Sequence, residues 1–143
     1  MDSDDQEFER VVALRRTPLF RYVPFETLLE VARSVQARVY LAGEQVQAGG
    51  ADGQDLLILE AGALMVGQGD GARTLAAPAC FGEVAVAGEP MRWPRITAVE
   101  NARVSLLRAT IFQELCREHP EMALELCRLL ARRLREAGAA DAH

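Results

Sequence analysis

The sequence predicts a single mainly-β domain, a sandwich or barrel of short strands, with α-helices at both ends. Its 143 residues suit one domain and are too few for two full ones. Short β-type segments separated by Gly, Asp and Pro fill the middle of the chain, which is typical of an all-β sandwich or barrel. On either side of them, apolar residues recur with helical spacing.

The N-terminal part, residues 5–35, is expected to be helical. Phe8, Val11 and Val12 follow a helical period until Thr17 and Pro18 interrupt it. A second helix is expected to begin near Pro24, because proline is well tolerated in the first turn. Its apolar face consists of four residues, Leu28, Leu29, Ala32 and Val35.

The β region is expected to extend from about residue 39 to residue 108. Its candidate strands share a short length and a high content of apolar or β-branched residues, and they are 39–41, 45–47, 56–60, 63–68, 73–77, 96–99 and 104–108. The Gly-rich run at residues 67–71 predicts a hairpin turn between two of them.

After Thr110 the pattern becomes helical again. A short helix is expected at residues 111–117 and a longer one from Pro120 to about Ala137. The longer helix has an apolar stripe expected to pack against the β region: Ala123, Leu126, Cys127, Leu130 and Leu134. Its arginines are expected to form a solvated face.

Composition excludes several classes of function. With 16 basic and 21 acidic residues the net charge is −5, which disfavours a general DNA or RNA binder, since such binding depends on neutralising phosphates. Every basic residue is Arg, so chemistry based on a catalytic or phosphate-binding lysine is excluded. With only two histidines the chain lacks the ligands for a His-rich metal site, and no nucleophile is paired with a base. We therefore expect no catalytic residue, no bound metal and no cofactor.

Compartment is also suggested by composition. No apolar run approaches the roughly 20 residues of a membrane-spanning helix, and the acidic start is unlike a signal peptide. The three cysteines are odd in number and lack metal-ligand spacing, so reduced thiols in the core are expected. These features predict a cytoplasmic protein that does not associate with membranes.

Two segments of the β region resemble the signature of the cyclic nucleotide-binding domain family, which includes the sensor halves of Crp/Fnr-type bacterial regulators. The first, at residues 46–62, has a glycine, a spacer, a second glycine, four apolar residues, two further residues and Gly62. The glycines allow tight turns of positive φ between strands. The resemblance covers about residues 14–137 and implies a β-roll (a double-stranded β-helix or jelly roll) with N-terminal helices and a C-terminal helix pair.

The second segment, Phe-Gly-Glu-Val-Ala-Val at residues 81–86, resembles the phosphate-binding cassette of that family. Gly82 would let the backbone approach a phosphate, and a short helical turn from Glu83 through Val84 and Ala85 would point N–H groups at the anion. The resemblance implies that Glu83 accepts a hydrogen bond from a ribose hydroxyl and that a following Arg pairs with the phosphate.

Two arginines compete for that phosphate role. Arg92 lies nine residues after Glu83, a spacing that resembles the family pattern, and it leaves Ile96 and Ala98 at the expected apolar and small positions. Arg95 is the alternative. Trp93 follows Arg92 at a position where the family usually has a small residue. We expect its ring either to pack in the core or to stack on the base of the nucleotide.

The resemblance implies a non-enzymatic sensor of a cyclic purine nucleotide, cAMP or cGMP, that signals through its C-terminal helix. Its partners would be a protein effector or a second subunit, including a homodimer through that helix, and not DNA. The rival interpretation is a degenerate member that binds no nucleotide and serves as an interaction module. Trp93 and Pro94 motivate it, as do Ala137 and Gly138, which stand where bacterial regulators supply hydroxyls to the purine.

Overall fold

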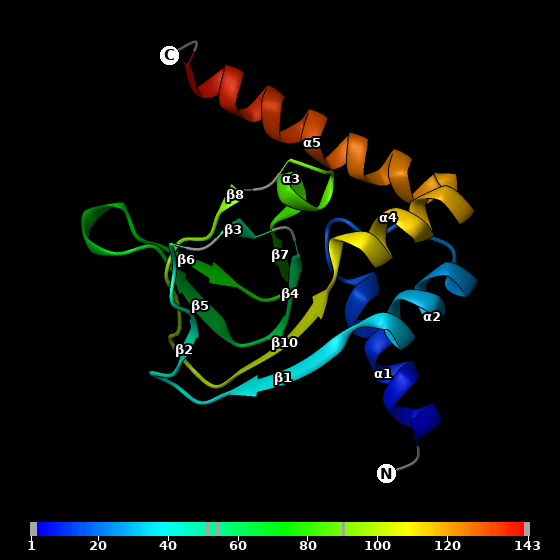
Figure 1. The fold of residues 1–143 in the computed structure, drawn as a ribbon, viewed down its shortest axis with the longest axis horizontal. Coiled ribbons are helices and arrows are strands. Elements are labelled where there is room, and N and C mark those ends of the chain that lie inside the picture. The colour runs from blue at the N-terminus through cyan, green and yellow to red at the C-terminus, as the bar shows by residue number, and fades with distance from the viewer. Residues whose placement is uncertain (1–2, 51, 54, 90, 142–143) are drawn as a thin grey trace.

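A computed structural model of the chain describes residues 3–50, 52–53, 55–89 and 91–141. Figure 1 shows a β-structure on one side and a helical layer on the other. The helices are α1 (Ser3–Arg15), α2 (Phe25–Ser34), α3 (Glu83–Val86), α4 (Ala109–Glu118) and α5 (Pro120–Asp141). The strands are β1 (Gln36–Tyr40), β2 (Gln45–Gln47), β3 (Asp52–Gly53), β4 (Leu56–Ala61), β5 (Ala63–Val66), β6 (Arg73–Ala76), β7 (Ala79–Phe81), β8 (Met91–Arg92), β9 (Ile96–Ala98) and β10 (Ala102–Leu107).

The strands form two four-stranded antiparallel sheets, in the orders β1-β10-β4-β7 and β2-β9-β5-β6, together with the short pair β3-β8. The hairpin expected at residues 67–71 is confirmed, since β5 pairs with β6 around a 3₁₀ turn at Gly69–Gly71. In the first sheet Leu57 of β4 is paired with Phe81, the last residue of β7. Helix α3 begins two residues later, so its start lies beside β4.

Strand β4 separates two apolar clusters. Its side chains alternate between the two faces of the sheet, as β geometry requires. Leu57 and Leu59 lie in a cluster inside the β-roll, whereas Leu56 and Ile58 lie in a cluster that includes the helices. All four are buried, so the continuous apolar run at 56–59 is explained by burial on both faces.

The helical cluster joins elements from both ends of the chain. Leu14 of α1, Leu28 of α2, Phe112 of α4 and Met122 of α5 all belong to it and are buried. Helix α5 then passes over α3, and its C-terminal part projects beyond the rest of the molecule (Figure 1). Among the described residues, none of the helices combines the length and apolarity that crossing a bilayer requires.

The β-roll with flanking helices is thus confirmed, with differences in detail. Strands β3, β7 and β8 were not predicted, because each has only two or three residues and takes its conformation from a paired neighbour. The expectation that the cysteines lie in the core is correct for Cys80 but wrong for Cys127, which is exposed. The apolar stripe of α5 also divides, since Leu126 is buried whereas Leu134 is 75% exposed. Of the 46–62 motif, Ala51 and Gln54 lie outside the described residues.

Candidate functional site beneath helix α5

Gly82 begins the candidate site with a backbone conformation that favours glycine. Its φ is +101°, in the left-handed region, and a Cβ at this position would lie 2.6 Å from the carbonyl oxygen of Asp55. The chain then enters α3, whose first turn is closed by the Val86 N–H donating to the Gly82 carbonyl at 2.9 Å. The short helical turn expected after Gly82 is therefore present.

Glu83 is the most unusual side chain of the site. It is only 4% exposed, although it carries a carboxylate. Its Oε2 lies 2.8 Å from Nη1 of Arg133 on α5, which forms an ion pair across the two helices. Its Oε1 is buried without a hydrogen-bond partner in the described part of the chain. A buried carboxylate oxygen without a partner is costly, and it is well suited to accept a hydrogen bond from a bound hydroxyl group.

The two other cassette residues differ in exposure. Ala85 is completely buried, whereas the Val84 side chain is 52% exposed. The structure therefore brings Gly82, Glu83 and Ala85 together at the base of the site. Val84 presents its side chain to solvent.

Arg92 is exposed on β8, opposite Asp52 of β3 in the strand register. A Cβ at Gly50 would lie 3.6 Å from Nη2 of Arg92, so the guanidinium group lies beside the turn that precedes β3. Arg95 is exposed too, and its carbonyl oxygen accepts a hydrogen bond of 2.7 Å from the Gly67 N–H. Both arginines are exposed, so an anion can reach them from solvent.

Trp93 lies inside the β-roll and is 6% exposed. Its ring centroid is 5.2 Å from that of Phe81, with the planes inclined by 44°. This geometry is a favourable tilted aromatic contact, and it places Trp93 in the same apolar cluster as Leu57 and Ile96. Core packing, one of the two roles expected for Trp93, is what the structure shows, and base stacking stays a prediction.

Sequence reasoning missed the partner of Glu83. The arginines of α5 were expected to form a solvated face, yet Arg133 spans the gap to α3 and its side chain is 47% exposed. The exposure of Arg133 agrees with a solvated face, but the expectation did not include this ion pair, in which a long side chain places its charged end at a buried group. The Ala-Arg-Arg-Leu sequence at 131–134 was visible, but the packing of α5 over α3 was not.

Similar proteins are found among solved structures. No protein-family model matches the chain, and no curated protein matches it. The catabolite activator protein of Thermus thermophilus is 31% identical with a TM-score of 0.73, over 86% of this chain and 61% of that protein. The N-terminal domain of a transcriptional regulator from Streptomyces coelicolor is 24% identical with a TM-score of 0.74, over 90% of this chain and 94% of that domain.

A third similar structure is the regulatory domain of a Toxoplasma gondii cAMP-dependent protein kinase (PKA), solved with cAMP. It is 22% identical with a TM-score of 0.67, over 80% of this chain and 46% of that chain. At this identity the likeness concerns the fold. Together with the two motifs and the geometry around Gly82, these likenesses confirm the resemblance deduced from the sequence: the chain has the fold of a cyclic nucleotide-binding domain.

Proposed function

We propose that the chain is a cytoplasmic, non-enzymatic sensor domain that binds a cyclic purine nucleotide, cAMP or cGMP, beneath α5. The observation that carries this proposal is the buried carboxylate of Glu83, whose Oε1 has no partner among the described residues and which follows directly on the left-handed Gly82. A ribose hydroxyl would supply the missing donor. The Toxoplasma regulatory domain, which is alike in fold and was solved with cAMP, supports the same ligand class.

The phosphate of the ligand would be held by the backbone of α3 and by an arginine. Arg92 is the first candidate, because it is exposed and an anion can reach it from solvent. Arg95 is the alternative on the same grounds. A planar guanidinium group matches the geometry of a phosphate through two parallel hydrogen bonds.

Binding would be coupled to α5 through Arg133. In this structure its guanidinium group is paired with Glu83, and a ligand that donates a hydroxyl to Glu83 while presenting an anion nearby would compete for both partners of that pair. The position of α5 would then depend on the ligand, to the extent that the ligand has different affinities for the two arrangements.

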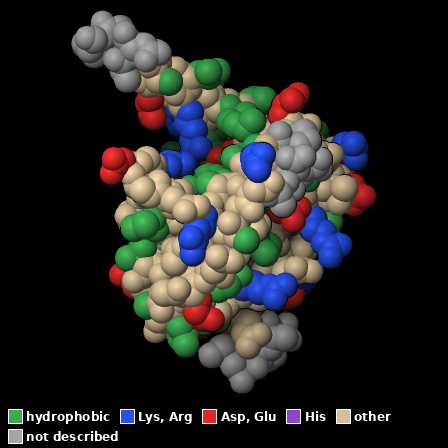
Figure 2. All heavy atoms as spheres, turned by 60° about the vertical axis from the view of Figure 1, so that its left-hand side comes forward, with side chains coloured by type: hydrophobic (Ala, Val, Ile, Leu, Met, Phe, Trp, Pro, Cys, Tyr) green, Lys and Arg blue, Asp and Glu red, His purple; other side chains and the backbone are tan. Residues whose placement is uncertain are grey.

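The exposed face of α5 is the proposed output surface. Leu124 and Leu134 are 49% and 75% exposed, and Cys127 and Ala131 between them are exposed as well. These positions follow helical spacing, so they form one apolar stripe. Figure 2 shows hydrophobic side chains in green on the projecting part of the molecule. A second copy of this chain or a protein effector would cover the stripe.

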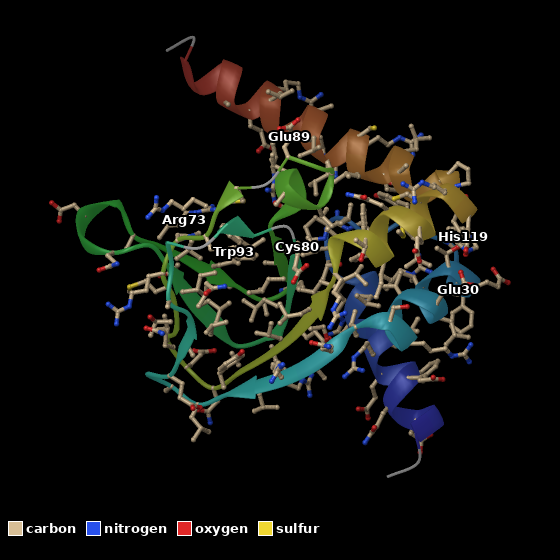
Figure 3. The ribbon with its side chains drawn as sticks, in the orientation of Figure 1. Glu30, Arg73, Cys80, Glu89, Trp93 and His119 are labelled. Atoms are coloured by element: carbon tan, nitrogen blue, oxygen red, sulfur yellow. The ribbon has the colours of Figure 1, made fainter. Side chains whose placement is uncertain are left out.

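Thermal unfolding with and without millimolar cAMP or cGMP tests nucleotide binding. A ligand at a hundredfold excess over its Kd stabilises the native state by about 2.7 kcal/mol, which is visible as a rise in Tm. We expect a rise with one of the two nucleotides and its loss in Glu83→Gln. Glu89→Gln is the matched control, because Glu89 is exposed and close in sequence (Figure 3).

The same assay separates the two phosphate candidates. Arg92→Ala should abolish most of the nucleotide-dependent rise in Tm, and Arg95→Ala should leave it. The reverse result would assign the phosphate contact to Arg95. If neither nucleotide raises the Tm of the unsubstituted chain, the sensor proposal is wrong.

The second candidate function is an interaction module that binds no nucleotide. The Arg133–Glu83 ion pair favours it, because the chain itself supplies a partner to the carboxylate that a ribose would need. Molar mass from light scattering, measured over a range of protein concentrations, tests this candidate. A stable dimer with no nucleotide-dependent rise in Tm would support it, and a monomer that binds nucleotide would exclude it.

A further inference from the structure

A cluster of metal-ligand side chains lies away from the nucleotide site, where α2 meets the junction of α4 and α5. Glu30 comes from α2, Glu118 is the last residue of α4, and His119 lies between α4 and α5. One ligand atom from each lies within 4.8 Å of the others. Figure 3 shows Glu30 and His119 pointing toward each other from the two helical segments. The cluster therefore joins residues 89 positions apart in sequence.

The imidazole of His119 has a carboxylate near each of its ring nitrogens. Its Nε2 contacts the Glu30 carboxylate, and its Nδ1 lies 3.7 Å from Oε1 of Glu121. The same Glu121 oxygen accepts a hydrogen bond of 3.2 Å from the hydroxyl of Thr27, which is buried on α2. In protein metal sites the second nitrogen of a ligating histidine commonly has a carboxylate beside it, and Glu121 lies on that side of the ring, at 3.7 Å and beyond hydrogen-bond distance.

Charge at the cluster also favours a cation. Three carboxylates, those of Glu30, Glu118 and Glu121, lie beside a single imidazole. The nearest arginine along α2, Arg33, is directed to α1, where its Nε lies 3.0 Å from Glu7. The His119 side chain is 25% exposed and that of Glu30 is 44% exposed, so an ion could enter from solvent and keep water ligands.

We propose that Glu30, Glu118 and His119 bind a divalent transition-metal cation such as Zn²⁺, with Glu121 and Thr27 as positioning residues. An imidazole nitrogen with carboxylate oxygens suits Zn²⁺ and related ions, whereas Mg²⁺ prefers oxygen ligands alone. The ion would tie α2 to the start of α5. This site is separate from the nucleotide site and does not depend on the proposed function.

Calorimetric titration of the metal-free, untagged chain with Zn²⁺ tests the proposal, with Mg²⁺ titrated in parallel. We expect one Zn²⁺ per chain and no comparable uptake of Mg²⁺. His119→Gln should abolish that binding. His143→Gln is the matched control, since His143, which lies outside the described residues, is the other histidine of the sequence. Equal Zn²⁺ binding by the unsubstituted chain and His119→Gln would overturn the proposal.

Further measurements distinguish this site from metal binding by cysteines and from a simple ion pair between helices. The Co²⁺ complex should lack the near-ultraviolet thiolate-to-metal absorption band, and the double variant Cys116→Ser with Cys127→Ser should leave the Zn²⁺ stoichiometry unchanged.

Glu121→Gln should weaken Zn²⁺ binding by about 10- to 100-fold, the usual effect of removing such a positioning group. A thiolate band, or loss of binding in the cysteine variant, would contradict the proposed ligands. So would an unaltered Zn²⁺ affinity in Glu30→Gln, with circular dichroism confirming that each variant is folded.

Discussion

The two halves of α5 differ in how they are attached to the rest of the protein. In the first half Met122, Leu126 and Leu129 are buried in the helical cluster, and the preceding His119 contacts Glu30 of α2. In the second half, every described side chain after Arg132 is exposed, and the ion pair of Arg133 with Glu83 connects it to α3. One continuous helix thus has an end held by apolar packing and an end held by charge.

Under the proposed function, this difference would decide which part of α5 responds to a ligand. Buried apolar contacts are not disrupted by a small polar ligand, whereas an ion pair can be exchanged for contacts with a hydroxyl and a phosphate. The second half of α5 is therefore the part suited to move. The first half supplies the fixed point about which such a movement would occur.

The largest expected effect comes from shortening a buried side chain in the first half. Met122→Ala should lower the free energy of unfolding by about 2–5 kcal/mol, because it removes a fully buried side chain and leaves a cavity. Leu134→Ala, in the second half, should change it by no more than about 0.5 kcal/mol. Urea denaturation at a fixed low protein concentration measures both. Similar losses in the two variants would show that the halves of α5 do not differ in attachment.

A smaller effect is expected from the ion pair that holds the second half. Arg133→Gln should lower the free energy of unfolding by about 1 kcal/mol, because Glu83 loses a partner while the partly exposed arginine is screened by solvent. Amide hydrogen exchange of residues 134–139 should accelerate in this variant. Arg135→Gln is the matched control, since Arg135 is exposed two positions further along. Unchanged exchange in Arg133→Gln would mean that other contacts hold this segment.

The smallest expected effect concerns thiol reactivity and leaves stability unchanged. Cys127, exposed on α5, should react quickly with a disulfide reagent at pH 8. Burial raises the pKa of Cys116 to about 11 and that of Cys80 to about 12, so both hold a smaller fraction of reactive thiolate at that pH. Rates for Cys116 should rise with pH toward its pKa. A lower rate for Cys127 at high protein concentration would locate a partner on the exposed stripe, and fast labelling of Cys80 would contradict its burial.

Much of the fold could be predicted because several of its elements are specified by patterns within short stretches of sequence. Helical spacing located α2 and α5, and the glycine-rich run at 67–71 located the turn between β5 and β6. The strands that escaped prediction, such as β8 at Met91–Arg92, have no periodicity of their own. They are strands because β3 pairs with β8 and β4 with β7, which is information from distant parts of the chain.

The candidate site was predictable only in part, for the same reason. Gly82 and Glu83 were identified because they lie in one short motif with β7 before it and α3 after it. Arg133 is 50 residues from Glu83, and nothing near it in sequence distinguishes it from Arg132 or Arg135 as the partner of a buried carboxylate. The Glu30–His119 cluster was missed similarly, because its members share no motif and meet only when α2 packs beside the junction of α4 and α5.

The two-sided burial of β4 has a consequence for how its register is specified. A strand with one polar face cannot shift its register by one residue without burying polar groups. The 56–59 run of β4 is apolar on both faces, so its side chains do not prevent such a shift. Backbone contacts at the two ends of β4 fix its register instead. Before the strand, the Asp55 carbonyl packs against Gly82, and after it Gly62 packs against the Asn101 carbonyl, in both cases closer than a Cβ would allow. Gly62 and Gly82 thus fix the register of β4 relative to β7 and to the 81–86 segment that follows from it.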